Sequence, residues 1–290
     1  MTILVIGKTG QLANELSTVS ANKYPLLGAK EINVFNEDEL SQQLLSYSPS
    51  ILINAAAYTA VDKAESESDK AYALNADAVK NLSTFCKSND CFLVHVSTDY
   101  VFDGSSGMPY PTDAEIAPQS IYGNSKAKGE QFLRDILGEN ATIIRTSWVY
   151  SEYGNNFVKT MLKLMRERSS IKVVDDQIGS PTWARGLAKA CIEAATHQYR
   201  GTFHWTDEGV LSWYDFAVAI HQLGLEKGLL NRQMEIIPIP SRDYPVPTPR
   251  PHYSVLDKTE TRSRFSTPMT HWYTQLSKMM DDLVRSDRTE

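Results

Sequence analysis

The sequence has 290 residues, of which 42% are hydrophobic and 22% charged, with a net charge of −6 and a pI near 5.6. This length allows one large domain or two interleaved ones. The acidic balance argues against a nucleic-acid-binding surface. No apolar run reaches the roughly 18 residues of a membrane span, so we expect no membrane insertion.

Two further features indicate a cytoplasmic location. The three cysteines show no metal-ligand spacing and cannot all pair, which favours reduced, buried thiols. The first predicted strand begins within two residues of the N-terminus, so we expect no signal peptide.

The N-terminal stretch has the form of a nucleotide-binding turn. The apolar run Ile3–Ile6 predicts a strand, and Gly7–Ala13 leads from it into a helical pattern. This is the context that a dinucleotide fingerprint requires. Gly7 permits a tight turn, and Gly10 lets the backbone approach a pyrophosphate at the helix N-terminus. An ordinary strand-to-helix turn is the alternative.

The end of the second predicted strand, at 24–29, bears on the choice of cofactor. Many NAD-binding folds place an acid there to hold the ribose hydroxyls, whereas this chain has Gly28, Ala29 and Lys30. Lys30 favours the 2′-phosphate of NADPH, but a solvated surface lysine explains it equally well. NADPH and NADH both stay open.

Strands and helices alternate through the first half of the chain. Three small residues at 55–57 come shortly after the strand at 51–53 and let a flat cofactor lie against the backbone, although a packing turn is the alternative. The later predicted elements, in order, are a helix at 62–81, a buried strand at 92–96, a helix at 121–137 and a strand at 141–145. The alternation predicts an α/β fold with a doubly wound, parallel, Rossmann-type sheet.

Three polar residues form the candidate catalytic group. Tyr122 and Lys126 are four residues apart, so a helix places both on one face. A nearby ammonium is expected to lower the pKa of a phenol and make it a usable proton donor or acceptor. Thr98 ends a predicted strand, at the edge where open α/β sheets bind ligands.

Beyond Tyr150 the pattern becomes irregular. The predicted elements are a helix opened by 154–157, a polar turn-rich stretch at 173–182, a helix at 183–196, a strand at 201–205, a helix at 212–223 and a proline-rich loop at 238–251. We expect residues 1–147 with about 183–206 to form the dinucleotide-binding domain. A smaller, interleaved C-terminal substrate domain takes about 148–182 and 207–290.

Together these motifs resemble those of the dTDP-4-dehydrorhamnose reductases, which are extended short-chain dehydrogenases/reductases. The resemblance covers nearly the whole chain. Its motifs lie at 7–12, 54–65, 97–104, 122–126, 145–150, 154–157, 176–182 and 250–251.

The resemblance implies the reaction and its catalytic residues. NADPH or NADH would reduce the C4 ketone of dTDP-4-dehydro-6-deoxy-L-mannose (dTDP-4-dehydro-β-L-rhamnose) to dTDP-L-rhamnose, the last step of dTDP-rhamnose biosynthesis. Tyr122 would donate the proton, Lys126 would be its partner and ribose ligand, and Thr98 would be the third catalytic group.

The resemblance also implies two sets of contacts. Besides Tyr122 and Lys126, the expected cofactor contacts are Gly7, Gly10, Gln11, Leu12, Asn33, Val34, Ala57, Tyr58 and Thr59. The expected contacts with the nucleotide sugar are Thr98, Asp99, Tyr122, Trp148 and Arg250. The guanidinium suits diphosphate oxygens, and Trp148 as a core aromatic residue is the alternative.

Two departures from the family pattern qualify these expectations. Related dehydratases carry Thr-Asp-Glu where this chain has Tyr100 after Asp99, so elimination of water is disfavoured. Some reductases of the family place Mg²⁺ at a homodimer contact through glutamates. Glu15 matches one of these, but Arg185 stands where another is expected. We therefore predict no metal ligands, although Mg²⁺ and a homodimer stay open.

Two rival functions stay open beside the reductase. One is a reductase or epimerase for another nucleotide sugar. The other is a non-catalytic, cofactor-binding regulatory subunit, because the regulatory subunit of methionine adenosyltransferase resembles this family. The presence of Tyr122, Lys126 and Thr98 favours an enzyme.

Overall fold

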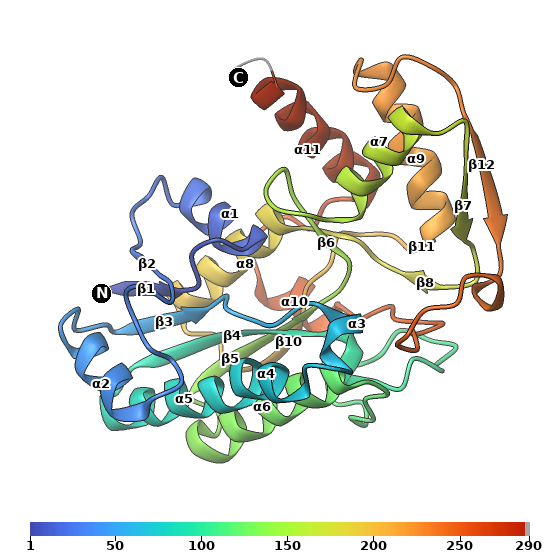
Figure 1. Ribbon diagram of the computed structural model, residues 1–290. Coiled ribbons are helices and arrows are strands. Elements are labelled where there is room, and N and C mark those ends of the chain that lie inside the picture. Colours follow the sequence, from blue (N-terminus) through green and yellow to red (C-terminus); the bar gives the residue numbers. More distant parts are fainter. Residues whose placement is uncertain (288–290) are drawn as a thin grey trace.

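The computed structural model describes residues 1–287, and its centre is a six-stranded parallel sheet (Figure 1). The strands lie in the order β10-β5-β4-β3-β1-β2, and each neighbouring pair is parallel. Their bounds are β1 (Ile3–Ile6), β2 (Leu26–Leu27), β3 (Ile51–Asn54), β4 (Phe92–Thr98), β5 (Ala141–Thr146) and β10 (Gly201–His204).

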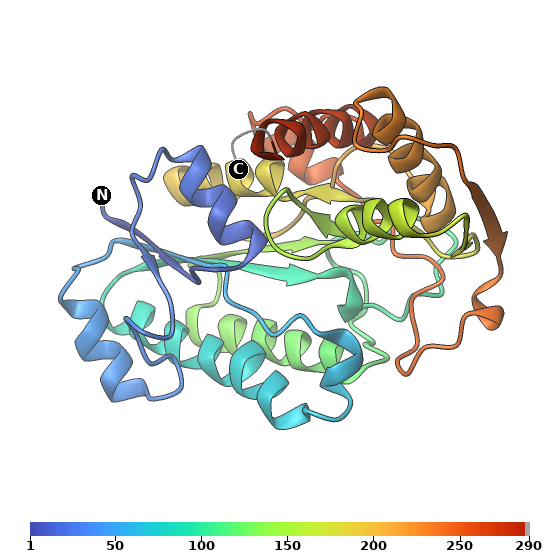
Figure 2. The same cartoon turned by 45° about the horizontal axis from the view of Figure 1, so that its top comes forward.

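Helices cover both faces of this sheet, which confirms the doubly wound α/β prediction (Figure 2). Helices α1 (Gln11–Val19) and α8 (Ala184–His197) pack together on one face. Helices α2 (Glu37–Leu45), α5 (Ala78–Ser88) and α6 (Ile121–Leu137) cover the other. All residues of β1 and β3 are buried, because a parallel sheet between two helical layers has no solvated face.

The strand order reverses beside β1. The chain passes from β1 to β2 on one side and then crosses to β3 on the other. The loops that leave β1 and β3 therefore diverge and open a crevice at the carboxyl edge of the sheet. In open α/β sheets, ligands bind at such a switch point.

A smaller lobe, at the upper right of Figure 1, contains most elements that follow β5. Its apolar core is a cluster separate from the two that flank the sheet. The remaining elements after β5 are β6 (Val149–Tyr150), α7 (Phe157–Glu167), β7 (Ser170–Val174), β8 (Ile178–Gly179), β9 (Thr182–Trp183), β11 (Leu211–Ser212), α9 (Trp213–Glu226), β12 (Glu235–Ile239), η3 (Ser241–Asp243), α10 (Thr259–Arg264) and α11 (Trp272–Asp287).

The predicted continuous helix at 62–81 is wrong. The chain instead forms α3 (Val61–Ala64), α4 (Ser68–Tyr72), the π-helical turn η1 (Ala73–Asp77) and then α5. The π turn places Asn75 against α6, where a Cβ at position 129 would lie 2.1 Å from the Asn75 carbonyl oxygen. Gly129 permits this approach. The Asn75 side chain also hydrogen-bonds the backbone of Tyr58, so tertiary contacts stabilise the turn.

Smaller differences concern strand lengths. The second strand is only Leu26–Leu27, and the predicted turn-rich stretch at 173–182 contains the short strands β8 and β9. Pro238, expected in a loop, lies in the two-stranded β7–β12 sheet, where an edge position tolerates proline. No helix within residues 1–287 has the length and apolarity to cross a bilayer.

Candidate active site

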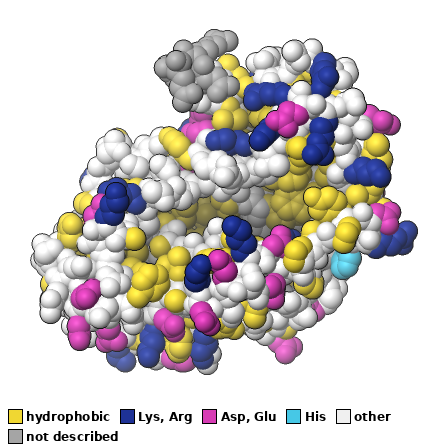
Figure 3. All heavy atoms as spheres, viewed as in Figure 1, with side chains coloured by type: hydrophobic (Ala, Val, Ile, Leu, Met, Phe, Trp, Pro, Cys, Tyr) yellow, Lys and Arg dark blue, Asp and Glu magenta, His cyan; other side chains and the backbone are white. Residues whose placement is uncertain are grey.

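A cavity of about 540 Å³ opens at the carboxyl edge of the sheet. Its walls come from the loops that follow β1, β3, β4 and β5, and from the start of α6. Figure 3 shows the hollow between the sheet and the smaller lobe, with hydrophobic side chains on its floor. The predicted residues along this cavity are Gly10, Gln11, Leu12, Ala57, Thr59, Thr98, Asp99, Tyr122, Lys126 and Trp148.

The glycine turn has two separate roles. Gly7 has a φ of +113°, and a Cβ there would lie 3.1 Å from the backbone of Ala55 and Ala56. It therefore lets the turn pack against the segment that leaves β3. Gly10 precedes α1, and a Cβ there would meet nothing within 4 Å. The helix N-terminus thus faces open space in the cavity without a side-chain cap, as phosphate binding requires.

The three predicted catalytic side chains lie along this cavity. Thr98 ends β4, and its hydroxyl donates to Asp99 Oδ1 at 2.9 Å and lies beside the Tyr122 hydroxyl. Tyr122 and Lys126 lie in the first two turns of α6, which begins after its N-cap Ser120. The Ser120 hydroxyl accepts from a backbone N–H of the first turn, so the cap fixes where the helix starts.

The pKa of Tyr122 differs from the sequence-based expectation. Burial raises it to about 12; a hydrogen bond from Thr98 lowers it in part, and the charge of Asp99 raises it. Lys126 is not among the causes. The prediction that its ammonium lowers the phenol pKa is therefore wrong for this arrangement. The phenol stays protonated at neutral pH, as a proton donor must.

Lys126 is turned toward β4. Its Nζ donates to the Val96 carbonyl at 2.7 Å and lies 3.4 Å from His95 Nε2. Only 2% of the residue is exposed. Burial lowers the Lys126 pKa to about 8, and the charge of Glu130 opposes this shift. The ammonium is thus held against the strand behind Tyr122.

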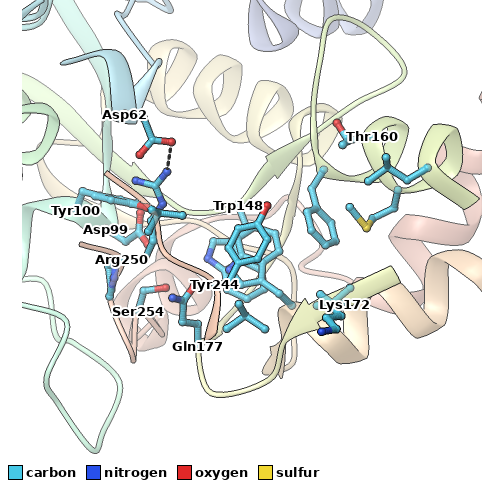
Figure 4. A pocket seen from close by; sticks show the side chains of 18 residues that line it. Asp62, Asp99, Tyr100, Trp148, Thr160, Lys172, Gln177, Tyr244, Arg250 and Ser254 are labelled. Carbon is cyan, nitrogen blue, oxygen red and sulfur yellow. Dashed lines mark hydrogen bonds and ion pairs between the residues drawn. The ribbon is translucent and has the colours of Figure 1, made fainter. Parts of the chain in front are cut away.

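A second cavity of about 390 Å³ lies on the side of the smaller lobe. Asp99, Tyr100 and Trp148 line both cavities, so the two meet beside the candidate catalytic residues. Figure 4 shows labelled side chains from both lobes converging on this space. Phe157, Met161, Leu164, Val173, Val174 and Trp213 contribute its apolar surface.

Trp148 is fixed in place by its neighbours. It has a φ of +47°, which is rare for a bulky residue, and it stacks on Trp213 with ring centroids 3.5 Å apart. Gly179 lies against it, because a Cβ there would be 2.7 Å from the indole ring. The side chain is therefore a preformed wall of both cavities and not an internal core residue.

Arg250 and Asp62 form an ion pair at the edge of the second cavity (Figure 4). Arg250 Nη2 donates to Asp62 Oδ2 at 2.7 Å. Arg250 Nη1 and Asp62 Oδ1 are buried without a hydrogen-bond partner among residues 1–287. A guanidinium nitrogen that lines a cavity without a protein acceptor is suited to an anionic ligand.

Comparisons with known proteins agree with this geometry. The family model described as the RmlD substrate binding domain matches residues 1–285. The dTDP-4-dehydrorhamnose reductase of Aggregatibacter actinomycetemcomitans is 38% identical over 288 residues, covering 96% of this chain and 97% of that protein. The chain belongs to the dTDP-4-dehydrorhamnose reductase family.

Two further relatives are similar to this chain over nearly its whole length. A crystal structure of the dTDP-4-dehydrorhamnose reductase of Bacillus anthracis in complex with NADP is 34% identical, with a TM-score of 0.90. The alignment covers 97% of this chain and all of that one. A protein of Streptomyces niveus named dTDP-4-keto-6-deoxy-D-glucose reductase is also 34% identical, and the match covers 95% of each chain.

Besides Gly7, three predicted cofactor contacts do not line the 540 Å³ cavity. Asn33 Nδ2 donates to Glu39 Oε2, and Val34 packs against the core beneath α2 and α5. Tyr58 directs its hydroxyl to Glu67 at 2.6 Å. None of these three residues lines the 540 Å³ cavity. Their contacts with cofactor stay predictions.

The possible metal ligand Glu15 forms an ion pair with the side chain of Arg185. Arg185 Nε donates to Glu15 at 2.8 Å, and its other nitrogens pair with Glu152 and Asp282. Burial and the neighbouring Glu152, opposed in part by Arg185, raise the Glu15 pKa to about 7. Within residues 1–287 no group of His, Cys, Asp and Glu side chains is arranged to hold a metal ion. Arg185 instead joins α1, α8 and α11.

We expect Arg185→Ala to destabilise the protein in a pH-dependent way. Three carboxylates would then face one another, so the free energy of unfolding should fall by about 1–3 kcal/mol near pH 7.5. Glu15 has a raised pKa and takes up a proton first, so the loss should be smaller near pH 5.5. Urea unfolding at the two pH values measures this. The exposed Arg242→Ala is the control, and equal losses at both pH values would contradict the prediction.

Several site residues were not predicted from the sequence. His95 interrupts an apolar strand, and this polar residue in a buried run was a usable signal. Ser254, which lines the second cavity with Asp99, and Trp213, which stacks on Trp148, come from distant segments. No local pattern marks either of them, because only the tertiary fold brings them to the site.

Proposed function

We propose that the chain reduces the C4 ketone of dTDP-4-dehydro-6-deoxy-L-mannose to dTDP-L-rhamnose with NADPH or NADH. The main support is the arrangement of the two cavities. Tyr122, Lys126 and Thr98 line the first, which has the form of a dinucleotide site, and this cavity adjoins a second one with aromatic walls. Membership of the dTDP-4-dehydrorhamnose reductase family supports the substrate.

The first cavity fits a nicotinamide dinucleotide. Open space at Gly10 and the uncapped N-terminus of α1 suit a pyrophosphate, and the small residues Ala55–Ala57 leave room for a flat ring against the backbone. Lys126, which lines this cavity, is proposed to hold the nicotinamide ribose. When bound, the reduced nicotinamide supplies the hydride that C4 of the sugar receives.

The protein residues supply the proton and hold the ketone. Tyr122, protonated at neutral pH, donates to the keto oxygen as the alcohol forms. Thr98, whose single O–H donates to Asp99 in this structure, donates to that oxygen instead when the ketone is bound. Because Tyr122 is 9% exposed, little water competes for these bonds.

The second cavity is proposed to bind the nucleotide sugar. Asp99 and Trp148 lie at the junction and contact the sugar, and Arg250 Nη1 meets the diphosphate. The apolar wall that includes Phe157 and Trp213 is suited to the base.

Replacing Arg250 by Ala should therefore weaken substrate binding more than chemistry. Losing a charge-assisted hydrogen bond should raise KM for the nucleotide sugar by about 10- to 100-fold. The kcat should change only a few-fold, because Arg250 lines the second cavity and not the first, where Tyr122 and Thr98 lie. Steady-state kinetics measure both, with the exposed Arg242→Ala as the matched control. An unchanged KM would contradict the proposal that Arg250 binds the diphosphate.

The direct test is cofactor oxidation with the enzymatically made 4-keto substrate. We expect turnover with the dTDP-linked 4-keto-L-sugar and much less with UDP- or GDP-linked counterparts. A second candidate is reduction of dTDP-4-keto-6-deoxy-D-glucose, which the name of the Streptomyces niveus relative favours. NMR of the product sugar separates the two. No oxidation with any nucleotide sugar, together with a co-purified partner protein, would favour the regulatory alternative.

The predicted domain division follows the same assignment. We infer that 1–147 with about 183–206 binds the dinucleotide, and that about 148–182 with 207–290 binds the nucleotide sugar. Residues 288–290 lie outside the described residues. The separate apolar core of the smaller lobe supports this division. The proposed cytoplasmic location rests on the cysteine pattern and the expected absence of a signal peptide. The proposed homodimer rests on the family resemblance, and light scattering tests it.

A further inference from the structure

His95 stands directly behind the candidate catalytic lysine. It is fully buried in β4, and its Nε2 lies 3.4 Å from Lys126 Nζ. Its other ring nitrogen, Nδ1, lies 3.1 Å from Asn54 Nδ2 at the end of β3. Burial holds the His95 pKa well below its usual value, and the charge of Lys126 acts in the same direction. The imidazole is therefore neutral and carries one N–H.

The orientation of the Asn54 amide decides which nitrogen carries that hydrogen. Asn54 Oδ1 accepts the backbone N–H of Ala56 at 3.1 Å, so Oδ1 is fixed on that side. Its NH₂ group therefore points at His95 Nδ1, which must act as the acceptor. The single N–H of the ring is then on Nε2 and faces Lys126.

An N–H that faces an ammonium group is electrostatically unfavourable, because both groups are donors. Lys126 also donates to the Val96 carbonyl, so only the amine form has a lone pair for His95. The other charged groups nearby are Glu130 on α6 and Asp99 after β4. Glu130 is committed to two hydrogen bonds from Arg145 on β5, and Asp99 hydrogen-bonds Thr98. The local geometry on β4 thus favours release of a lysine proton.

We propose that Asn54 and His95 are positioning residues that hold Lys126 against β4 and stabilise its neutral amine form relative to the ammonium. This rests on the proposed function. The Tyr122 O–H bond breaks as the alcohol O–H bond forms at C4. The phenolate of Tyr122 then regains its proton from solvent. Whenever Lys126 is in its amine form, its lone pair accepts the hydrogen bond from His95 Nε2–H.

The tautomer of His95 gives a test that needs no turnover. Long-range ¹H–¹⁵N NMR spectra distinguish protonated from unprotonated ring nitrogens. The His95 signals are those that disappear in His95→Phe or, should that variant not fold, in His95→Gln. We expect hydrogen on Nε2 and none on Nδ1 near neutral pH. Hydrogen on Nδ1 would overturn the proposal, whatever substrate the enzyme uses.

The pH profile of turnover tests the consequence. His95→Phe keeps a ring but removes the N–H, so the ammonium becomes more stable. The alkaline limb of kcat should then move up by about one pH unit. An unmoved limb, or one that moves to lower pH, would overturn the proposal. His221→Phe, which removes a buried histidine in α9, is the matched control and should leave the limb in place. Absence of turnover in the wild type would count against the proposed function, and the tautomer measurement would still decide the role of His95.

Discussion

Replacing Tyr122 by Phe is expected to lower kcat by about 10²- to 10⁴-fold, the range for losing a general acid. The substitution removes one oxygen and keeps the ring, which packs edge-on against Tyr100 with centroids 5.4 Å apart. The fold and the cavity should therefore persist. Oxidation of reduced nicotinamide in the presence of the 4-keto substrate measures kcat, and fluorescence of the bound cofactor checks that binding is retained.

Tyr110→Phe is the matched control for this experiment. Tyr110 is also buried and donates its hydroxyl to Asp103 at 2.5 Å, but it lines neither cavity. It should leave kcat within a few-fold of the wild type. A Tyr122→Phe enzyme that turns over as fast as the Tyr110→Phe enzyme would show that the proton comes from another group, and the proposed mechanism would fail.

The parts predicted correctly from the sequence are those set by local patterns. Short apolar runs gave the parallel strands, because residues buried between two helical layers have no polar alternation. The predicted helix at 121–137 coincides with α6 because a serine cap begins it and Gly138, at a φ of +58°, ends it. The Tyr122–Lys126 spacing then places both side chains along one cavity.

The parts that the sequence did not predict depend on contacts between distant segments. The direction of Lys126 is set by Val96 and His95 on another element, so its effect on Tyr122 was misjudged. The π turn at Asn75 depends on the close approach of α6 at Gly129. Each of these features depends on a residue that is distant in the sequence. A hydrophobic periodicity of 2 or 3.6 residues describes only local structure and does not identify such a partner.

Arg145→Met is expected to lower the free energy of unfolding by about 3 kcal/mol, the low end of the range for breaking a buried ion pair, because Arg134 still donates to Glu130. Arg145 donates two hydrogen bonds to Glu130, at 2.9 and 2.8 Å, and the two side chains are 1% and 0% exposed. The pair joins α6 to β5. Denaturant unfolding near pH 7 measures the loss.

The pH dependence of this loss has a definite sign. Burial alone would raise the Glu130 pKa, but the hydrogen bonds and charge of Arg145 and the charge of Arg134 lower it from 4.5 to about 2. The ion pair therefore contributes its stability above about pH 4.5 and loses it as pH falls toward about 2. The difference between wild type and Arg145→Met should shrink over that window.

Arg134→Met separates the effect of burial from that of charge alone. Arg134 donates to the same carboxylate at 2.9 Å, but its side chain is 38% exposed. Its loss should be about 1 kcal/mol or less, because water replaces an exposed partner. Equal losses in the two variants would mean that desolvation of Glu130 does not decide the energy of this pair. Glu130 lies one turn beyond Lys126 on α6. If the Arg145 pair anchors this helix to the sheet, kcat should also fall in Arg145→Met at denaturant concentrations at which the variant is still folded.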